Sequence, residues 1–484
     1  MPDFRVPLII RGEVIEDYEV THEDRSGTGR TFLTPDVSKY VDKLATRAET
    51  LSDLYTITLE DIYDYLEELS HRLNLDTNPY WREAYEVSRY TSNLSEGVLR
   101  NYYQMAGQTL SRGHVKDTVE GRIGSQYLEG WVPIRQSDGR VINVRAIGSR
   151  SIHIVAGNVP VVSVGTLMRS AITRNDAVIK APSNDPMTAV ALARTMIDMA
   201  PEHPITKHFS VGYWKGGDEA IESKLYRAHN FEKICAWGGY ASIKHISKYL
   251  GPGLDLITLD PKNSATLVGR ETFDNQDIMR EIAARVAADV GGMDQEGCIN
   301  TRVMFAETGT DAAGLEKANQ FGQMIFDSIQ KLPSTFSNGP RRFPQDCKSE
   351  IESILQLKEF YHVITDVNRI EQTGAVIVSQ MDEQVDFPMQ LYGRTVNLVP
   401  VDNIERALDS FSAATQTVGI YPPSLRLRLR DKAALVGGQM FQPIGYATMG
   451  NMSGPCDGVE AERRMCRWVV DSEYDECDIS VPWE

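Results

Sequence analysis

The chain has 484 residues, 42% of them hydrophobic and 24% charged, which is typical of a soluble globular protein with two or three domains. The formal net charge of −17 argues against general binding to nucleic acid or to anionic membranes. The six cysteines form no Cys-x-x-Cys pair, so we expect neither a disulfide scaffold nor a metal site. No signal peptide or membrane-spanning apolar run is present, which predicts a cytoplasmic location.

The N-terminal part of the chain is predicted to be mostly helical. Residues 5–20 alternate apolar and polar types around Arg11-Gly12, which predicts a short hairpin. Residues 36–108 are polar and helix-favouring with apolar repeats, so we expect a helical layer that packs on another part of the fold. Residues 127–146 contain two β-rich runs around Asp138-Gly139, a pair typical of hairpin turns.

From residue 152 onward the pattern alternates between strands and helices. Strands are predicted at residues 152–156, 177–181, 209–213, 233–237 and 254–259, and helices at 162–174, 185–199, 218–228 and from Gly239 to about 250. Asp185 is the expected N-cap of the second helix, with Pro186 at its first position. Repeated βα units predict an α/β fold with a doubly wound parallel sheet, the usual platform for a dinucleotide.

A second set of strands and helices is expected at residues 261–450, around Cys298. Apolar residues recur every four positions over 274–290, which predicts a helix, and Gly291-Gly292 is expected to end it in a left-handed turn. Residues 302–306 are predicted to be a strand. Cys298 then lies on a short loop that holds its sulfur firmly but accessibly, as covalent thiol chemistry requires. The alternative is an inert, buried cysteine.

The C-terminal region has three recognisable segments. Residues 425–430 alternate leucine and arginine, and we interpret them as a solvated or pocket-lining helix rather than a nucleic-acid site, given the acidic chain. A glycine-containing loop at 449–455 precedes a predicted helix at 460–470. The acidic tail at 471–483 closes the chain.

Three further segments follow predicted strands and could bind ligands. The Asn158 amide could donate a hydrogen bond to an oxyanion, or could cap the next helix. Lys180, at the end of a parallel strand, could hold a ribose or a phosphate, or be a solvated surface lysine. Gly238 and Gly239 permit close approach of the backbone to a cofactor, although Gly-x-Gly-x-x-Gly is absent. Cys235 is expected in the core.

Taken in order, these motifs resemble the aldehyde dehydrogenase superfamily. Ala156-Gly157-Asn158-Val159-Pro160 is similar to its Pro-Trp-Asn loop, Val178-Ile179-Lys180-Ala181-Pro182-Ser183 to its adenosine-ribose strand, Ala236-Trp237-Gly238-Gly239 to its Phe-Thr-Gly-Ser turn, Gln295-Glu296-Gly297-Cys298 to its Gly-Gln-x-Cys loop, and Gln390-Leu391-Tyr392-Gly393-Arg394 to its Glu-x-Phe-Gly-Pro segment. Glu296 replaces the family glutamine, and Gln390 the family glutamate. More narrowly, residues 127–470 resemble the acyl-CoA reductase family, which includes the reductase subunits of bacterial luminescence.

This resemblance implies an aldehyde dehydrogenase-like fold with three parts. The dinucleotide-binding domain would comprise residues 1–126 and 150–260, and the catalytic domain residues 261–470. An oligomerisation hairpin at 127–149, to which residues 471–484 could add, implies a homo-oligomer. The implied reaction is NADPH-dependent reduction of a fatty acyl-CoA or acyl-protein thioester to an aldehyde through a cysteine acyl-enzyme. A partner acyl-protein synthetase is implied as well.

The same resemblance assigns the site residues. The implied catalytic residues are Cys298 and Asn158, and the implied cofactor-binding residues are Lys180, Ser183, Gly238, Gly239, Gln390 and Tyr392. Thr258 occupies the place of the glutamate that activates water in hydrolytic relatives, which favours acyl transfer over acid formation. Ser183 replaces a carboxylate that would repel a 2′-phosphate, which favours NADPH. The alternatives are an aldehyde dehydrogenase that forms acids and a non-catalytic protein of the same fold.

Overall fold

The computed structural model describes residues 3–24, 29–451 and 453–473. The chain divides into two compact units. Unit 1 comprises residues 1–91, 103–259 and 451–484, and unit 2 comprises residues 92–102 and 260–450. The short segment 92–102 therefore belongs with the later part of the chain, and the segment after 451 belongs with the earlier part. The sequence suggested one domain of residues 1–126 and 150–260 and another of residues 261–470. The units differ from those boundaries at the two segments just named.

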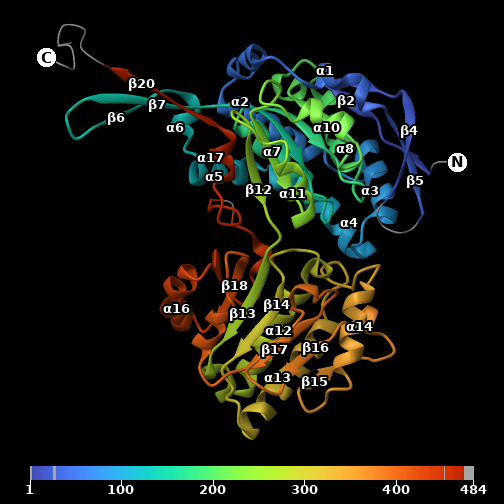
Figure 1. The fold of residues 1–484 in the computed structure, drawn as a ribbon, viewed down its shortest axis with the longest axis vertical. Coiled ribbons are helices and arrows are strands. Elements are labelled where there is room, and N and C mark those ends of the chain that lie inside the picture. Colours follow the sequence, from blue (N-terminus) through green and yellow to red (C-terminus); the bar gives the residue numbers. More distant parts are fainter. Residues whose placement is uncertain (1–2, 25–28, 452, 474–484) are drawn as a thin grey trace. The chain divides into compact units, whose positions relative to one another are not determined.

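A seven-stranded sheet forms the centre of unit 1 (Figure 1). Its strands, in spatial order, are β12 (Asp255–Leu259), β11 (Lys233–Trp237), β8 (Arg150–Ile154), β9 (Asp176–Lys180), β10 (Phe209–Gly212), β2 (Leu8–Ile10) and β3 (Glu13–Ile15). The first five are parallel, which confirms the predicted doubly wound sheet. Both β8 and β9 are buried along their whole length, as expected for parallel strands covered on two faces. The predicted N-terminal hairpin is the antiparallel pair β2–β3.

Helices cover the sheet of unit 1. They include α2 (Leu59–Arg72), α3 (Pro79–Thr91), α5 (Arg112–Arg122), α7 (Val161–Ile172), α8 (Thr188–Met199), α10 (Glu219–Leu225) and α11 (Tyr240–Ser247). The predicted start of α8 is wrong. Asp185 is not the N-cap, because the helix begins three residues later and the Asp185 carboxylate instead accepts hydrogen bonds from the backbone and hydroxyl of Thr188. Cys235 is 4% exposed and lies in the core, as predicted.

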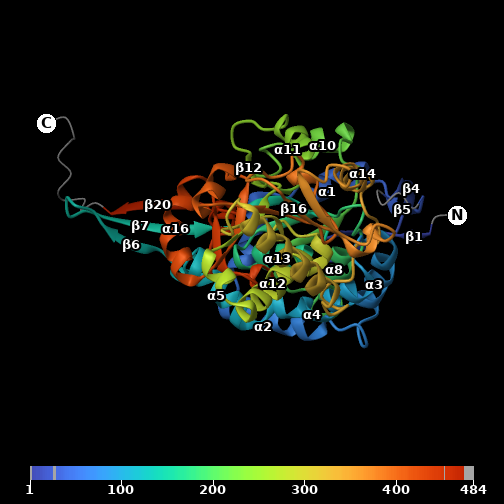
Figure 2. The same cartoon turned by 90° about the horizontal axis from the view of Figure 1, so that it is seen from below.

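A separate three-stranded sheet belongs to unit 1 and projects from its other elements (Figures 1 and 2). It consists of β6 (Val132–Arg135), β7 (Val141–Ile147) and β20 (Arg467–Glu473). The predicted hairpin is confirmed from residue 132 onward, with Gly139 at φ +90°, but residues 125–129 form a helical turn, α6 (Ser125–Glu129). The predicted helix at 460–470 is wrong in its second half. Only α17 (Ala461–Met465) is helical, because the β-favouring residues after it pair with β7.

Part of the predicted tail, residues 474–484, lies outside the described residues. Among the residues that the structure does describe, no helix combines the length and apolar character needed to span a bilayer.

Unit 2 is built on a second seven-stranded sheet. Its spatial order is β15 (Tyr361–Ile364), β16 (Val376–Ser379), β17 (Val396–Pro400), β14 (Thr301–Ala306), β13 (Asn263–Val268), β18 (Thr415–Tyr421) and β19 (Met440–Pro443). Helices α12 (Gln276–Gly291) and α13 (Ala312–Gln330) pack side by side against one face (Figure 2), and α16 (Pro423–Leu435) lies on the other. Successive residues of β14 lie on opposite faces of the sheet: Met304 packs toward α12, and Phe305 packs toward α16.

The glycine pair after α12 has a different role from the one predicted. Gly291 is the last helical residue and Gly292 has φ −51°, so neither takes a left-handed conformation. A Cβ atom on Gly291 would lie 2.5 Å from Leu332 Cδ1, and one on Gly292 would lie 2.9 Å from Thr448 Cγ2. A larger residue at either position would therefore displace neighbouring side chains around the loop that follows.

Candidate active site

Cys298 lies in unit 2, on the loop between the short turn η5 (Gly292–Gln295) and β14. Its side chain is partly exposed and carries a thiol that is not part of a disulfide. In contrast, Cys347 of the same unit is 1% exposed, and burial raises the pKa of its thiol to about 12. Cys298 thus has the accessibility that a nucleophile requires.

Three consecutive residues before Cys298 have left-handed backbone conformations. Met293, Asp294 and Gln295 have φ values of +57°, +53° and +65°. For residues other than glycine, each such conformation costs roughly 1–3 kcal/mol, so it persists only where surrounding contacts hold it. The contacts of Asp294 and Gln295 supply that support.

The carboxylate of Asp294 collects three backbone N–H donors. Its Oδ1 accepts from Asn338 at 2.7 Å and Gly339 at 3.0 Å, and its Oδ2 accepts from Ser95 at 2.7 Å. Asp294 is fully buried. One side chain thereby fastens the left-handed turn to two other segments of unit 2, including the segment 92–102 from far earlier in the chain.

The amides of Gln295 and Asn300 fix the two ends of the loop. Gln295 donates to the carbonyls of Thr301 and Thr395 at 3.0 and 2.8 Å, and accepts from the Thr395 N–H at 2.9 Å. Asn300 donates to the carbonyls of Asp289 and Gly292, and accepts from the Gly297 N–H at 3.0 Å. Both are fully buried. These hydrogen bonds hold the loop that carries the Cys298 thiol in a fixed conformation, as a covalent catalyst requires.

Glu296 occupies the position of the family glutamine in this loop. Its Oε1 accepts a hydrogen bond from Asn93 Nδ2 at 2.7 Å, and burial raises the pKa of its carboxyl group to about 7. Asn93 Nδ2 also bonds the hydroxyl of Tyr392, one of the residues predicted to bind the cofactor. Tyr392 is thus placed near the nucleophile loop within unit 2. Gln390, in the turn η6 (Pro388–Gln390), is exposed.

Asn158 lies in unit 1, on the loop that follows β8; the residue is partly exposed, although its Oδ1 atom is buried. It does not cap the next helix, because Pro160 is the N-cap of α7. The loop is tightly packed: a Cβ atom on Gly157 would lie 2.1 Å from Asn184 Oδ1, and Asn184 Nδ2 donates to the Gly157 carbonyl at 3.0 Å. These contacts hold the backbone next to Asn158 in place.

A cavity of about 280 Å³ in unit 1 lies at the C-terminal ends of β8 and β9. It is lined by Ile154, Lys180, Gly216, Gly217, Glu222, Ala241, Ser242, His245 and Ile246. Lys180 is 9% exposed, with its Nζ 5.5 Å from the ring centre of Trp214, so it is not a solvated surface lysine. The cavity therefore combines the buried Lys180 cation with the Glu222 carboxylate, the His245 imidazole and several apolar side chains.

The other predicted cofactor residues do not line this cavity. Ser183 is 7% exposed and follows β9, Gly238 follows β11, and Gly239 is the N-cap of α11. Two lining residues were not predicted from the sequence, Glu222 and His245, whose Oε2 and Nε2 atoms lie 2.6 Å apart. They come from α10 and α11, and no spacing signal in the sequence links them.

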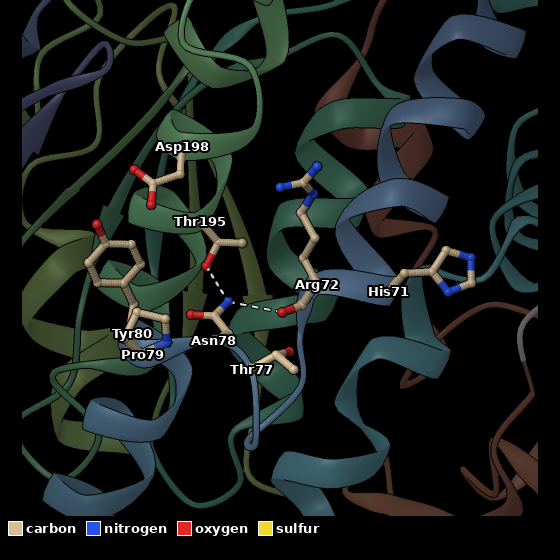
Figure 3. A pocket seen from close by; sticks show the side chains of 8 residues that line it. All are labelled: His71, Arg72, Thr77, Asn78, Pro79, Tyr80, Thr195 and Asp198. Carbon is tan, nitrogen blue, oxygen red and sulfur yellow. Dashed lines mark hydrogen bonds between the residues drawn. The ribbon is translucent and has the colours of Figure 1, made fainter.

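A second cavity of unit 1, of about 330 Å³, lies between α2, α3 and α8 (Figure 3). Its Asn78 donates to the Arg72 carbonyl at 3.0 Å and to Thr195 Oγ1 at 2.8 Å, while His71 points away from the other labelled side chains. The amide of Asn78 is thus used to join the helices. In the described part of the chain, no group of three or more His, Cys, Asp or Glu side chains is arranged to hold a metal ion.

Solved structures share the fold. Lactaldehyde dehydrogenase from Escherichia coli superposes with a TM-score of 0.72 at 14% identity, covering 98% of this chain and 100% of the other. An NADP-dependent glyceraldehyde-3-phosphate dehydrogenase from Bacillus halodurans C-125, complexed with NADP, gives 0.70 at 12% identity, covering 97% and 99%. The fold is therefore that of the aldehyde dehydrogenases, as the motifs predicted.

Sequence comparison identifies the family. A long-chain acyl-protein thioester reductase of Photorhabdus luminescens is 29% identical over 427 residues, which cover 86% of this chain and 82% of the relative. One from Photobacterium leiognathi is 25% identical and covers 99% and 96%. The family model described as acyl-CoA reductase (LuxC) matches residues 54–468. The chain therefore belongs to the acyl-CoA reductase (LuxC) family of enzymes.

Proposed function

We propose that this protein reduces a fatty acyl thioester to a fatty aldehyde, with Cys298 as the acyl-accepting nucleophile and NADPH as the reductant. The observation that carries the proposal is the partly exposed Cys298 thiol on a loop fastened by Asp294, Gln295 and Asn300. Relatives named long-chain acyl-protein thioester reductases support the choice of substrate.

In the proposed first step, the Cys298 thiolate attacks the carbonyl carbon of the thioester. A new C–S bond forms, the donor's C–S bond breaks, and the departing thiolate takes a proton from water. The Asn158 amide and the Cys298 backbone N–H are proposed to stabilise the oxyanion. Thr258, in β12, replaces a carboxylate base, so hydrolysis of the acyl-enzyme lacks its catalyst.

The cofactor would be held at the cavity that contains Lys180. Ser183, Gly238 and Gly239 do not line that cavity, and they are proposed as additional contacts beyond it. When bound, NADPH supplies the hydride that converts an acyl group to the aldehyde level. Lys180 can pair with a 2′-phosphate, and Ser183 presents no carboxylate to repel it. These two residues support NADPH over NADH. Gln390 and Tyr392 of unit 2 are proposed as further cofactor contacts.

The proposed donors are acyl-CoA or an acyl-protein, and an acyl-protein synthetase is the proposed supplier of the acyl group. Self-association is proposed through the projecting sheet of β6, β7 and β20. Its exposed apolar side chains support this role, because such side chains gather where protein surfaces meet. They are Ile134, Val469 and Val470, and the exposed Trp131 lies directly before β6.

The decisive test is intact-protein mass spectrometry after incubation with acyl-CoAs of graded length, without NADPH. Wild-type protein should gain the mass of one acyl group, and Cys298→Ala should gain none and oxidise no NADPH. Cys456→Ala, which removes another partly exposed thiol, is the matched control and should behave as wild type. Acyl-CoA reduction by Cys298→Ala would refute the proposal. Release of acid instead of aldehyde would favour an aldehyde dehydrogenase.

A further inference from the structure

The Glu296 carboxyl group lies in a defined environment two residues before Cys298. One of its hydrogen-bond donors is Asn93 Nδ2, and two backbone N–H groups fix the orientation of the Asn93 residue. Asn93 Oδ1 accepts from the Arg342 N–H at 2.9 Å, and the Asn93 carbonyl accepts from the Arg341 N–H at 2.9 Å. The amide therefore presents an N–H to Glu296 in a fixed direction.

Charged groups face Glu296 from each element around it. Asp294 lies on the same turn, Arg302 on β14, and Arg342 on the loop before α14 (Gln345–Ile354). Arg302 interacts electrostatically with Glu296 and Cys298, and also with the buried Cys347 thiol, and its Nη1 donates to the Leu391 carbonyl. One partly buried guanidinium is thus shared between a carboxyl group and the candidate nucleophile.

We propose that Glu296 tunes the reactivity of Cys298 through Arg302. When Glu296 is neutral, the positive charge of Arg302 stabilises the Cys298 thiolate. When Glu296 is ionised, its negative charge offsets Arg302 and opposes the loss of the thiol proton to water. Glu296 is therefore a positioning residue, and the inference depends on the proposed function only in taking Cys298 as the nucleophile.

The titration range of Glu296 fits this role. Burial, with a smaller contribution from Asp294, raises the pKa of its carboxyl group to about 7, while the Asn93 hydrogen bond and the two arginines lower it. Both forms of Glu296 are therefore present near neutral pH. Glutamine, the residue of the superfamily pattern at this place, has the shape of the neutral form and does not ionise.

The test is the rate of alkylation of Cys298 by iodoacetamide, followed by mass mapping of its peptide between about pH 6 and about pH 9. At the acidic end, wild type and Glu296→Gln should react equally. At the alkaline end the variant should react faster, by roughly three- to tenfold for one screened charge. Glu316→Gln, an exposed carboxylate of α13, is the matched control and should follow wild type.

A second variant, Asn93→Ala, tests the inference independently of Glu296→Gln. In Asn93→Ala the carboxyl group loses the Asn93 hydrogen bond, which lowers its pKa in the wild type, so Glu296 should stay neutral to higher pH and alkylation near pH 7 to 8 should exceed wild type. A ratio of Glu296→Gln to wild type that is constant across pH, or wild-type behaviour of Asn93→Ala, would overturn the inference. Alkylation needs neither acyl donor nor NADPH, so these results are separate from the test of the proposed function.

Discussion

Ser264 Oγ donates a hydrogen bond to the backbone carbonyl of Cys298 at 2.8 Å. The same oxygen accepts from the Thr417 N–H at 3.2 Å. A single hydroxyl on β13 therefore connects the candidate nucleophile to β18, and Ser264 is 2% exposed, so water does not replace these bonds.

Ser264→Ala should destabilise unit 2 by roughly 1–3 kcal/mol, because it leaves the Cys298 carbonyl and the buried Thr417 N–H without their shared partner. It should also slow acylation of Cys298. Urea unfolding followed by circular dichroism measures the first effect. The five tryptophans among the described residues all belong to unit 1, so their fluorescence provides an internal reference. Ser349→Ala, at an exposed serine of α14, should change neither signal; an equal loss there would contradict the assignment.

Asp289 should make the stability of unit 2 depend on pH. Its carboxylate accepts from the N–H groups of Gly445 and Ala447 at 2.7 and 2.9 Å, and burial raises its pKa to about 6. Because the folded pKa lies above the unfolded value, this contribution to stability is present below about pH 4 and is lost as the pH rises through about 6.

Wild type should therefore lose roughly 2 kcal/mol from this group between about pH 4 and about pH 8. Asp289→Asn should be less stable than wild type at acidic pH, because the amide N–H₂ group is a donor where the backbone N–H needs an acceptor. The variant should also lack this pH dependence. Urea titrations at the two pH values measure the difference. An unchanged slope in the variant would show that Asp289 is not the titrating group.

Glu462 should be essential for the segment that follows residue 451. This fully buried carboxylate lies 2.5 Å from Arg122 Nη1 and 2.9 Å from Arg169 Nε. Glu462→Gln leaves two guanidinium groups without their anion, a loss of roughly 3–5 kcal/mol. Tryptophan fluorescence during urea unfolding should show the loss in unit 1. Glu460→Gln, at an exposed site on the same segment, should stay within about 0.5 kcal/mol of wild type.

Ser183 should control the choice between the two nicotinamide cofactors. Ser183→Glu places a carboxylate where serine can bond a 2′-phosphate, so the KM for NADPH should rise by about tenfold or more while that for NADH does not. The ratio of kcat/KM for the two cofactors measures this effect apart from any loss of stability. Ser247→Glu adds the same charge at an exposed position near the end of α11 and should leave the ratio unchanged.

The sequence determined the layered core of both units. Parallel strands that are buried on both faces, such as β8 and β9, appear as short apolar runs between helical repeats, so their order could be predicted. The position of Cys298 on a loop between α12 and β14 followed from the same local patterns. These features could be predicted because they depend on the periodicity of a segment, which is set by residues that are neighbours in the sequence.

Tertiary structure alone decided the features that depend on distant partners. Residues 467–473 became a strand because β7 pairs with them, although the local pattern predicted a helix as far as residue 470. Met293 and Asp294 adopt left-handed conformations that their residue types disfavour, since the N–H groups of Ser95, Asn338 and Gly339 converge on one carboxylate. The raised pKa of Glu296 likewise arises from burial, and burial depends on the packing of segments distant in sequence.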